Sequence, residues 1–223
     1  MVSPHYYWWN MAYGIFVLQI LSYLSVIPML MYASWHHYII AYFLYFLFGG
    51  LGMIVGYHRL HSHRSFHVPL WFEKLITIFA TMSLTGPAID WVAIHRAHHK
   101  WHDTPKDPHS PEHKGRLKVH FLTMFAKVSP KFAMDLIRTP FYMWQRKYYF
   151  YIIAAYAAIL YLIDPLAVVY AWLFPAFLTV FLGTLILSTS HREGKAHDDF
   201  ILGILTWGDA FHHTHHEKPM QNR

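Results

Sequence analysis

The sequence contains no cysteine among its 223 residues. Disulfide bonds and thiolate metal sites are therefore excluded. Any metal ion that the chain binds must be held by imidazole, carboxylate or water. Histidine, with 20 copies, is by contrast far more abundant than a hydrophobic core requires. The histidines are therefore the first candidates for chemistry.

Charge is scarce as well. Asp, Glu, Lys and Arg make up 13% of the chain, whereas about a quarter is usual in soluble domains. Hydrophobic residues reach 55% and aromatic residues 19%. This composition excludes an ordinary soluble domain and predicts an integral membrane protein. We expect membrane lipid as a partner and no nucleic acid.

Long apolar runs predict four transmembrane helices in two hairpins, because about 20 apolar residues are enough to cross the hydrocarbon layer. The runs cover residues 11–32, 38–57, 148–163 and 166–190. Asp164 and Pro165 mark the turn of the second hairpin. Glycines in the second run would allow another helix to approach closely.

The basic residues predict the topology. Of the 18 Lys and Arg residues, 14 lie between Arg59 and Lys147 and four follow His191. None precedes Arg59, and none lies in either hairpin turn. Four spans place both basic regions on one side, which the positive-inside rule makes cytoplasmic. We therefore expect both termini and all the clustered histidines to face the cytoplasm.

Between the hairpins, the chain reads as a helical cap. Residues 70–83 are apolar but too short for a span, which favours a re-entrant or interfacial helix. Residues 91–101 are expected to be helical, 103–111 to form turns, and 115–147 to form amphipathic helices. The predicted fold is all-α: one domain over 1–223, with spans in two hairpins and a cytoplasmic cap from 58–147 and 191–223.

Three histidine clusters lie in the cap. On a helix, residues at i, i+3 and i+4 share a face. The second and third clusters have this spacing, and the first has a spacing of five residues that separates its members by about 140° on a regular helix. We therefore expect the helix to end near the first cluster. The clusters are His58 and His63; His95, His98 and His99; and His212, His215 and His216.

These eight imidazoles are too many for one tetrahedral zinc ion. They suit two metal ions of higher coordination number, and imidazole alone leaves zinc, copper, iron and nickel open. Other histidines are off this spacing. We assign five to an interface or the surface, namely His5, His36, His37, His109 and His113, and five to supporting or solvent-facing positions, namely His61, His67, His102, His120 and His213.

The three clusters and their flanks resemble the histidine boxes of membrane fatty acyl desaturases. The resemblance covers about residues 49–219 and is strongest to the delta-9 branch acting on acyl-CoA or acyl-lipid, particularly its bacterial members. The matching stretches are Gly56-Tyr57-His58-Arg59 with Ser62-His63-Arg64-Ser65-Phe66, Trp91-Val92-Ala93-Ile94-His95-Arg96-Ala97-His98-His99 with Asp103-Thr104 and Asp107-Pro108-His109-Ser110, and Leu205-Thr206-Trp207-Gly208-Asp209-Ala210-Phe211-His212.

The resemblance implies two irons held by nine histidines and a water-linked asparagine. His191 matches the ninth histidine, but Leu187 stands at the asparagine position, so one iron is expected to have an altered coordination sphere. The implied reaction uses O2 and two electrons from a separate donor, such as cytochrome b5 or ferredoxin, to place a cis double bond in a saturated acyl chain. Ala93 and Ile94 replace an Arg-Asp pair of animal acyl-CoA enzymes, so the carrier stays open between CoA, lipid and acyl carrier protein.

Two kinds of binding residue are expected around the acyl chain. Gly49, Gly50, Gly52 and Trp91 are candidates to line an apolar tunnel. Four basic residues either bind a phosphate-bearing head group or form a solvated basic face: Arg64, Lys100, Lys106 and Arg192.

Three other functions remain open. The same di-iron scaffold can hydroxylate an alkyl or lipid substrate, and an alcohol product would distinguish that reaction. A metal transporter or sensor would need ionisable ligands inside its spans, and these spans have almost none. An inactive relative that only binds lipid is the third alternative, because Leu187 departs from the family pattern.

Overall fold

The computed structural model describes residues 4–193 and 195–218 and is mostly helical, as predicted. The only β-structure in these ranges is a two-stranded antiparallel hairpin and an isolated bridge between Asp198 and Phe211. The elements are α1 (Pro4–Leu24), α2 (Val26–Tyr32), α3 (Trp35–Tyr45), η1 (Phe46–His63), α4 (Leu70–Met82), α5 (Ala88–Trp101), α6 (Pro111–Lys114), α7 (Arg116–Phe121), η2 (Thr123–Phe125), η3 (Pro130–Ala133), α8 (Met134–Ile137), α9 (Pro140–Lys147), α10 (Tyr149–Ile163), η4 (Val169–Leu173), α11 (Phe174–Thr189), β1 (His191–Arg192), β2 (Lys195–Ala196), α12 (Phe200–Leu205) and α13 (His212–Glu217).

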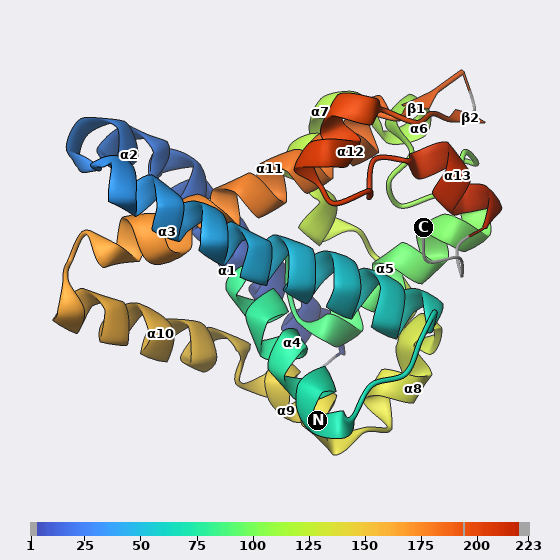
Figure 1. The fold of residues 1–223 in the computed structure, drawn as a ribbon. Helices are drawn as coiled ribbons and strands as arrows, with labels where there is room; N and C mark the ends of the chain where they lie inside the picture. Colours follow the sequence, from blue (N-terminus) through green and yellow to red (C-terminus); the bar gives the residue numbers. More distant parts are fainter. Residues whose placement is uncertain (1–3, 194, 219–223) are drawn as a thin grey trace.

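The first hairpin joins α1 and α2 to α3 and η1 (Figure 1). The break between α1 and α2 follows from Pro28, which has no N–H and whose ring crowds the carbonyl four residues earlier, that of Leu24. The second helix begins at Trp35, three residues before the predicted start, because Ser34 precedes it and its backbone N–H donates to His37 Nδ1 at 3.0 Å.

The helix that starts at Trp35 ends at His63, so it ends at the first cluster as expected but continues past the predicted end of the span at Tyr57 and includes both histidines. From Phe46 onward its hydrogen bonds are of the wider π type, which connects residues five apart. It ends at Arg64, which has a left-handed backbone with φ 53°. The first two clustered histidines therefore belong to one uninterrupted helix.

The second hairpin consists of α10, η4 and α11 (Figure 1). Among the described residues, three helices are long and apolar enough to cross a membrane: Met11–Tyr32, Trp35–His63 and Val169–Thr189. The apolar helix Tyr149–Ile163 has 15 residues, fewer than the about 20 that a perpendicular crossing needs. The four-span topology therefore stays a prediction.

Two apolar cores hold the helices together. The first lies among the hairpin helices and contains Phe48, Tyr149 and Trp172, and the second lies under the cap and contains Tyr57 and Val92. Helix α4 packs along η1, so the predicted 70–83 segment is a helix. Its close approach requires glycine at one position, because a Cβ on Gly52 would lie 2.5 Å from the Ala80 backbone nitrogen.

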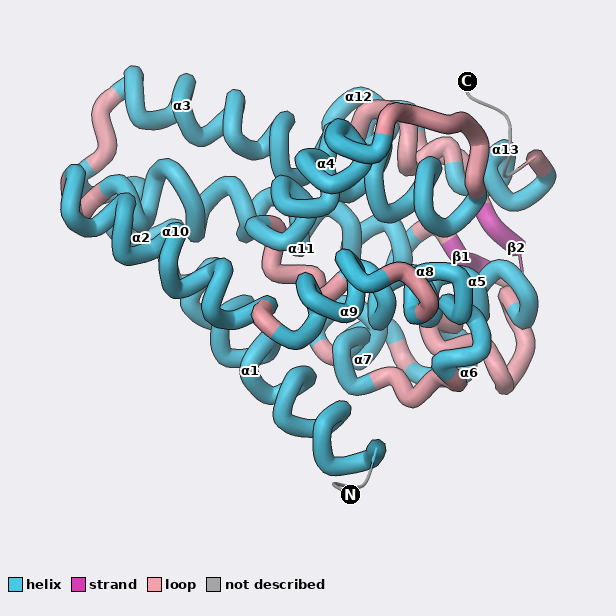
Figure 2. The backbone as a smooth tube through the Cα atoms, turned by 90° about the horizontal axis from the view of Figure 1, so that it is seen from below, coloured by secondary structure: helices cyan, strands magenta, loops and turns pink. Residues whose placement is uncertain are grey.

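The short helices α6 to α9 gather at the end of the molecule opposite the turn between α2 and α3 (Figure 2). The C-terminal helix α13 reaches the same end, next to α5, and α12 lies against α11 (Figure 1). Segments from three distant parts of the sequence, namely the end of η1, α5 and α13, therefore meet at one place.

Candidate metal centre

The nine predicted ligands come together in two groups whose candidate ligand atoms lie within 4.8 Å of one another. The larger group draws on η1, α5 and α13, and the smaller on α5, β1 and α13. The five-histidine group is His58, His63, His95, His99 and His215, and the four-histidine group is His98, His191, His212 and His216. The sequence did not predict how the histidines would divide between the groups.

In the five-histidine group, the Nε2 atoms of the rings converge. His215 Nε2 lies 2.9 Å from both His58 Nε2 and His99 Nε2. His63 Nε2 lies 2.9 Å from His95 Nε2. Adjacent turns of α5 supply His95 and His99, while the π-type turn of η1 aligns His58 with His63, whose ring centroids are 4.9 Å apart.

The four-histidine group converges in the same manner. His212 Nε2 lies 2.9 Å from His191 Nε2 and 3.1 Å from His216 Nε2. His98 Nε2 lies 3.2 Å from His216 Nε2. Three of the four rings are buried and His216 is partly buried.

This arrangement fits two metal ions better than a hydrogen-bonded histidine cluster. A neutral imidazole carries one N–H, so the single Nε2 of His215 cannot donate to two rings, and the same holds for His212. The buried Nδ1 atoms of His212 and His216 also have no hydrogen-bond partner. Two nitrogens bound at about 2.1 Å to one ion lie about 3 Å apart when they meet it at a right angle, which matches the observed spacing.

Several of the histidines, including His95, His212 and His215, are held in the neutral form that metal binding requires. Burial, followed by the neighbouring imidazoles, lowers the pKa of His95 and His212 well below the ordinary value. Burial and the imidazole of His58 lower the pKa of His215 to about 3. These three rings are therefore neutral throughout the physiological range.

An apolar cavity of about 120 Å³ reaches both groups. Its histidine wall includes His58 and His95 from the larger group and His212 from the smaller. Its other walls come from α1, η1, α5 and α11 and are mostly apolar, including Met53, Ile54, Trp91, Ile94, Leu182 and Leu187. A long apolar ligand would therefore lie directly against both candidate metal sites.

Comparison with known proteins identifies the family. The family model described as "Fatty acid desaturase" matches residues 33–222 of this chain. The chain is 34% identical to the sn-2 palmitoyl-lipid 9-desaturase of Nostoc sp. (strain 36), covering 97% of this chain and 80% of that protein. It is 29% identical to the sn-1 stearoyl-lipid 9-desaturase of Synechocystis sp., covering 93% and 69%, and 34% identical to Delta-9 acyl-lipid desaturase 2 of Arabidopsis thaliana, covering 78% and 62%.

The chain belongs to the fatty acid desaturase family. It is an oxidoreductase, and its delta-9-like relatives agree with the resemblance seen in the histidine boxes.

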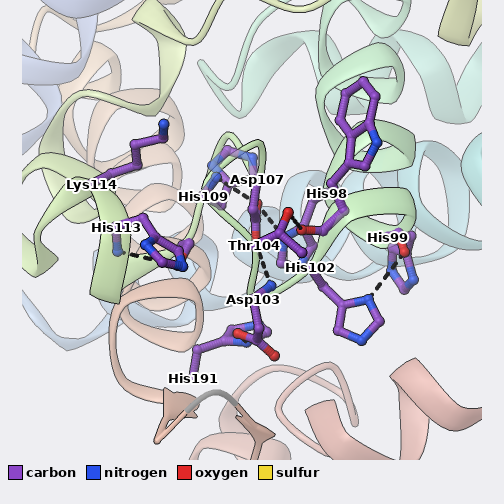
Figure 3. Close-up of polar contacts among 12 residues, drawn as sticks. His98, His99, His102, Asp103, Thr104, Asp107, His109, His113, Lys114 and His191 are labelled. Carbon is purple, nitrogen blue, oxygen red and sulfur yellow. Dashed lines mark hydrogen bonds and ion pairs between the residues drawn. The ribbon is translucent and has the colours of Figure 1, made fainter.

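Three aspartates orient the desaturase histidines, a role that the sequence interpretation missed. Asp107 Oδ1 lies 2.9 Å from His98 Nδ1, and Asp103 Oδ1 lies 2.9 Å from His191 Nδ1. Figure 3 shows both aspartates beside these rings on the loop after α5. Asp209 Oδ1 lies 2.7 Å from His58 Nδ1. A carboxylate on Nδ1 directs Nε2 inward and raises the basicity of the ring, as is typical of metal-bound histidines.

Unusual backbone conformations place two of these aspartates. Asp103 itself is left-handed, with φ 57°, a conformation that aspartate tolerates better than most residues. Trp207 and Gly208 precede Asp209 with φ values of 49° and 92°. The aspartates were visible as parts of the resembling motifs, and their position beside turn residues was the signal for a role in orienting ligands.

Arg96 is the second missed residue. Its guanidinium donates to the carbonyls of His61 and Ser62 at the end of η1 and to the carboxylate of Asp135. Burial alone would raise the pKa of Asp135, but hydrogen bonds and charge from Arg96 and Arg64 outweigh it and hold the pKa below the ordinary value. Arg96 thus satisfies carbonyls that a helix end leaves without partners and fixes η1 against α5.

Several residues predicted to bind or face solvent lie elsewhere in the desaturase. His109, assigned to the surface, is buried in the cavity wall with its Nδ1 unpartnered. Buried His61 faces Thr77 Oγ1 at 3.0 Å, and buried His120 lies 3.4 Å from Ser188 Oγ. His36, His67, His102, His113 and His213 are exposed, His37 is partly exposed, and the side chain of His5 lies outside those described.

The predicted lining is confirmed in part. Gly49 and Trp91 line the cavity, whereas Gly50 packs against Trp207 and Gly52 against α4. Among the basic residues, Arg64 pairs with Asp135 at 2.6 Å, and Lys100 lies over the rings of Trp101 and Phe132. Arg192 donates to the Thr189 carbonyl, and Lys106 lines a separate hollow near Lys118.

Proposed function

We propose that the protein is a di-iron, O2-dependent fatty acyl desaturase that places a cis double bond, at the delta-9 position, in a saturated chain. The observation that carries this proposal is the meeting of both histidine groups with one apolar cavity. A site of that shape brings a methylene chain against the metals and keeps bulk water away from it.

We propose that the five-histidine group holds one iron and the four-histidine group the other, with nine histidine ligands in all. When bound, the irons supply with O2 the oxidising power that an unactivated C–H bond demands and that no amino-acid side chain has. The donor set suits iron, because imidazole accepts it readily. Leu187 lines the cavity and offers no ligand, so we propose that one iron has an altered coordination sphere relative to the family pattern.

The chain's own residues position the substrate and exclude water. Trp91 stacks on His95, with ring centroids 4.8 Å apart, and forms a flat wall beside the larger group. Gly49 and Thr179 meet across the cavity, since a Cβ on Gly49 would lie 3.0 Å from Thr179 Oγ1. Thr179 is ten residues before Thr189 on α11, or about 15 Å from the histidine end of that helix. We infer that Gly49 and Thr179 close the end of the cavity that holds the acyl carbons farthest from the metals.

The membrane placement is also part of the proposal. We propose four spans with both termini and the metal centre cytoplasmic. The positive-inside distribution supports this orientation, and Figure 1 supports it by showing both hairpin turns at the end opposite the histidines. Helix α10 would cross the bilayer with the help of flanking residues, or at a place where the bilayer is locally thinner.

The relatives favour a lipid-linked acyl chain over CoA or acyl carrier protein, since two are described as palmitoyl-lipid and stearoyl-lipid 9-desaturases. Ile94, at the position of an acid in animal acyl-CoA enzymes, lines the cavity here with an apolar side chain. Electrons are proposed to come from a separate donor such as cytochrome b5 or ferredoxin.

Iron analysis and fatty-acid profiling of cells that express the chain test the proposal. The host should lack its own desaturase and be supplied with a cytochrome b5 or ferredoxin system. We expect two irons per chain and a new cis-monounsaturated acid in membrane lipid. A H95A/H212A variant, which loses a ligand from each group, is the matched control. Two irons with an alcohol product would show that the protein is a hydroxylase and not a desaturase. Bound iron with no product in either donor system would favour an inactive lipid-binding relative.

A further inference from the structure

His109 is a buried histidine with no assigned role. It is 7% exposed, it lines the cavity, and its Nδ1 has no hydrogen-bond partner. A buried polar atom without a partner costs free energy, of the order of 1–3 kcal/mol. Such an atom therefore calls for a ligand or a water molecule that the protein alone does not supply.

The position of His109 relates it to the four-histidine group. Its ring centroid lies 5.7 Å from that of His98. Asp107 Oδ1 accepts both from His98 Nδ1, at 2.9 Å, and from the His109 backbone N–H, at 2.8 Å. One buried carboxylate therefore fixes a candidate ligand and His109 together.

The four-histidine group has one imidazole fewer than its neighbour. Leu187, Ile186 and Ile94 of the cavity lining are apolar and offer no ligand. The hydroxyls of Thr179, Thr184 and Thr206 each donate to the carbonyl four residues earlier. Three residues of the cavity lining have a buried side-chain atom without a hydrogen-bond partner, namely His109, His212 and Asp209. His212 is itself a candidate ligand, and Asp209 Oδ1 lies 2.7 Å from His58 Nδ1, so His109 is the one of the three without another assignment.

We propose that His109 completes the four-histidine group by holding a water molecule as a further ligand of its metal ion. The ring nitrogens of His109 are not among the atoms of the four-histidine group that lie within 4.8 Å of one another. His109 is therefore too far away to bind the same ion directly. A bound water adds about 2.8 Å to a metal bond of about 2.1 Å, which gives a reach of about 5 Å. Such a water has two strong partners, the ion and the imidazole.

The test measures Fe(II) binding to the metal-free, full-length protein by competition with a chelator. H109F keeps a ring but removes both nitrogens. We expect H109F to lower the affinity for one of the two ions by about tenfold to hundredfold, the usual loss when a supporting group of a metal ligand is removed. The affinity for the other ion should be unchanged. H109Q, whose carboxamide can still hold water, should retain most of the affinity. H113F is the matched control, because His113 is an exposed histidine on the same loop and helix segment.

A Mössbauer spectrum of the iron-loaded protein provides a readout independent of activity. One of the two ferrous components should change in H109F and both should be unchanged in H113F. Equal binding and equal spectra in wild type and H109F would overturn the inference. If H109F and H109Q both lost affinity equally for the two ions, the role of His109 would be purely structural and the inference would be overturned. H109L replaces H109F if H109F does not fold.

This inference rests on the proposed di-iron function, and the experiment separates the two. Wild-type protein that binds fewer than two irons would refute the di-iron proposal itself. Two tightly bound irons in both wild type and H109F would refute only the role of His109.

Discussion

The rings of His58 and His63 lie on one face of η1, with centroids 4.9 Å apart, although the residues are five positions apart in sequence. On a regular α-helix they would be separated by about 140°. The π-type hydrogen bonds of η1 reduce this separation, because the wider turn brings residue i+5 closer to the face of residue i. A single helix therefore supplies two members of the five-histidine group.

Exchanging Ser62 and His63 tests this register. The S62H/H63S variant retains two imidazoles on the helix but moves one to a buried position whose native hydroxyl donates to the Tyr57 carbonyl. We expect this variant, like H63A, to bind one iron fewer than wild type when iron is counted in purified protein. Two irons in the exchanged variant would show that the α-helical spacing serves equally well and would contradict the role of the π-type turn.

Neutralising Asp107 should weaken metal binding without removing a ligand. D107N keeps the shape of the side chain but leaves His98 Nδ1 beside an amide in place of a carboxylate. We expect about tenfold to hundredfold weaker binding of one Fe(II) in chelator competition. E112Q, on the exposed neighbouring helix α6, removes one negative charge at a distance from the rings and should bind as wild type. Equal affinities in D107N and wild type would exclude an orienting role.

Much of this centre could be predicted from the sequence, because local spacing carries the information. His95, His98 and His99 lie on one helix face wherever that helix packs, and the same is true of the cluster that begins at His212. The apolar runs likewise predict long helices whatever their tertiary contacts. Eight candidate ligands and the helical class follow from such short-range patterns, whereas the ninth, His191, was expected only from the resemblance to the desaturase family.

What could not be predicted depends on contacts between distant segments. The division into groups of five and four depends on how α5 and α13 face each other, and the burial of His109 depends on the loop that Asp107 closes. The continuation of η1 past His58 was missed because periodicity assumes an α-helical turn. Arg96 was given no separate role in the sequence, because its partner Asp135 is 39 residues away in the chain.

Replacing Arg96 by lysine should loosen the end of η1. R96K keeps the charge but cannot donate at once to the carbonyls of His61 and Ser62 and to Asp135. We expect the free energy of unfolding to fall by about 2 kcal/mol, the scale of lost hydrogen bonds to charged groups. R116K, at an exposed position, should leave stability unchanged. Thermal unfolding in detergent compares the two, and equal shifts would contradict the clamp.

Acidification should destabilise the metal-free protein. In the folded state the pKa of His215 is about 3 and those of His95 and His212 are also lowered, whereas an unfolded chain has histidine pKa values of about 6.5. Between these values the unfolded state binds more protons, so stability falls as the pH drops below about 6.5. We expect the metal-free protein to have a lower melting temperature at pH 5.5 than at pH 7.5. The iron-loaded protein should lose bound iron over the same interval. A melting temperature that rises on acidification would contradict the buried, neutral state of the rings.

The length of the product chain should depend on Thr179. This residue faces Gly49 across the cavity and lies ten residues before the histidine end of α11. In T179F the larger ring fills the space that the distal carbons need, while the metal centre is untouched. The ratio of 16-carbon to 18-carbon monounsaturated products in the host lipids should therefore rise relative to wild type. L178F, on the same helix but outside the cavity lining, adds a ring without narrowing the cavity and should leave the ratio unchanged. If both variants gave the wild-type ratio, the acyl chain would not extend toward Gly49 and Thr179, and its distal end would have to leave the metals by another path.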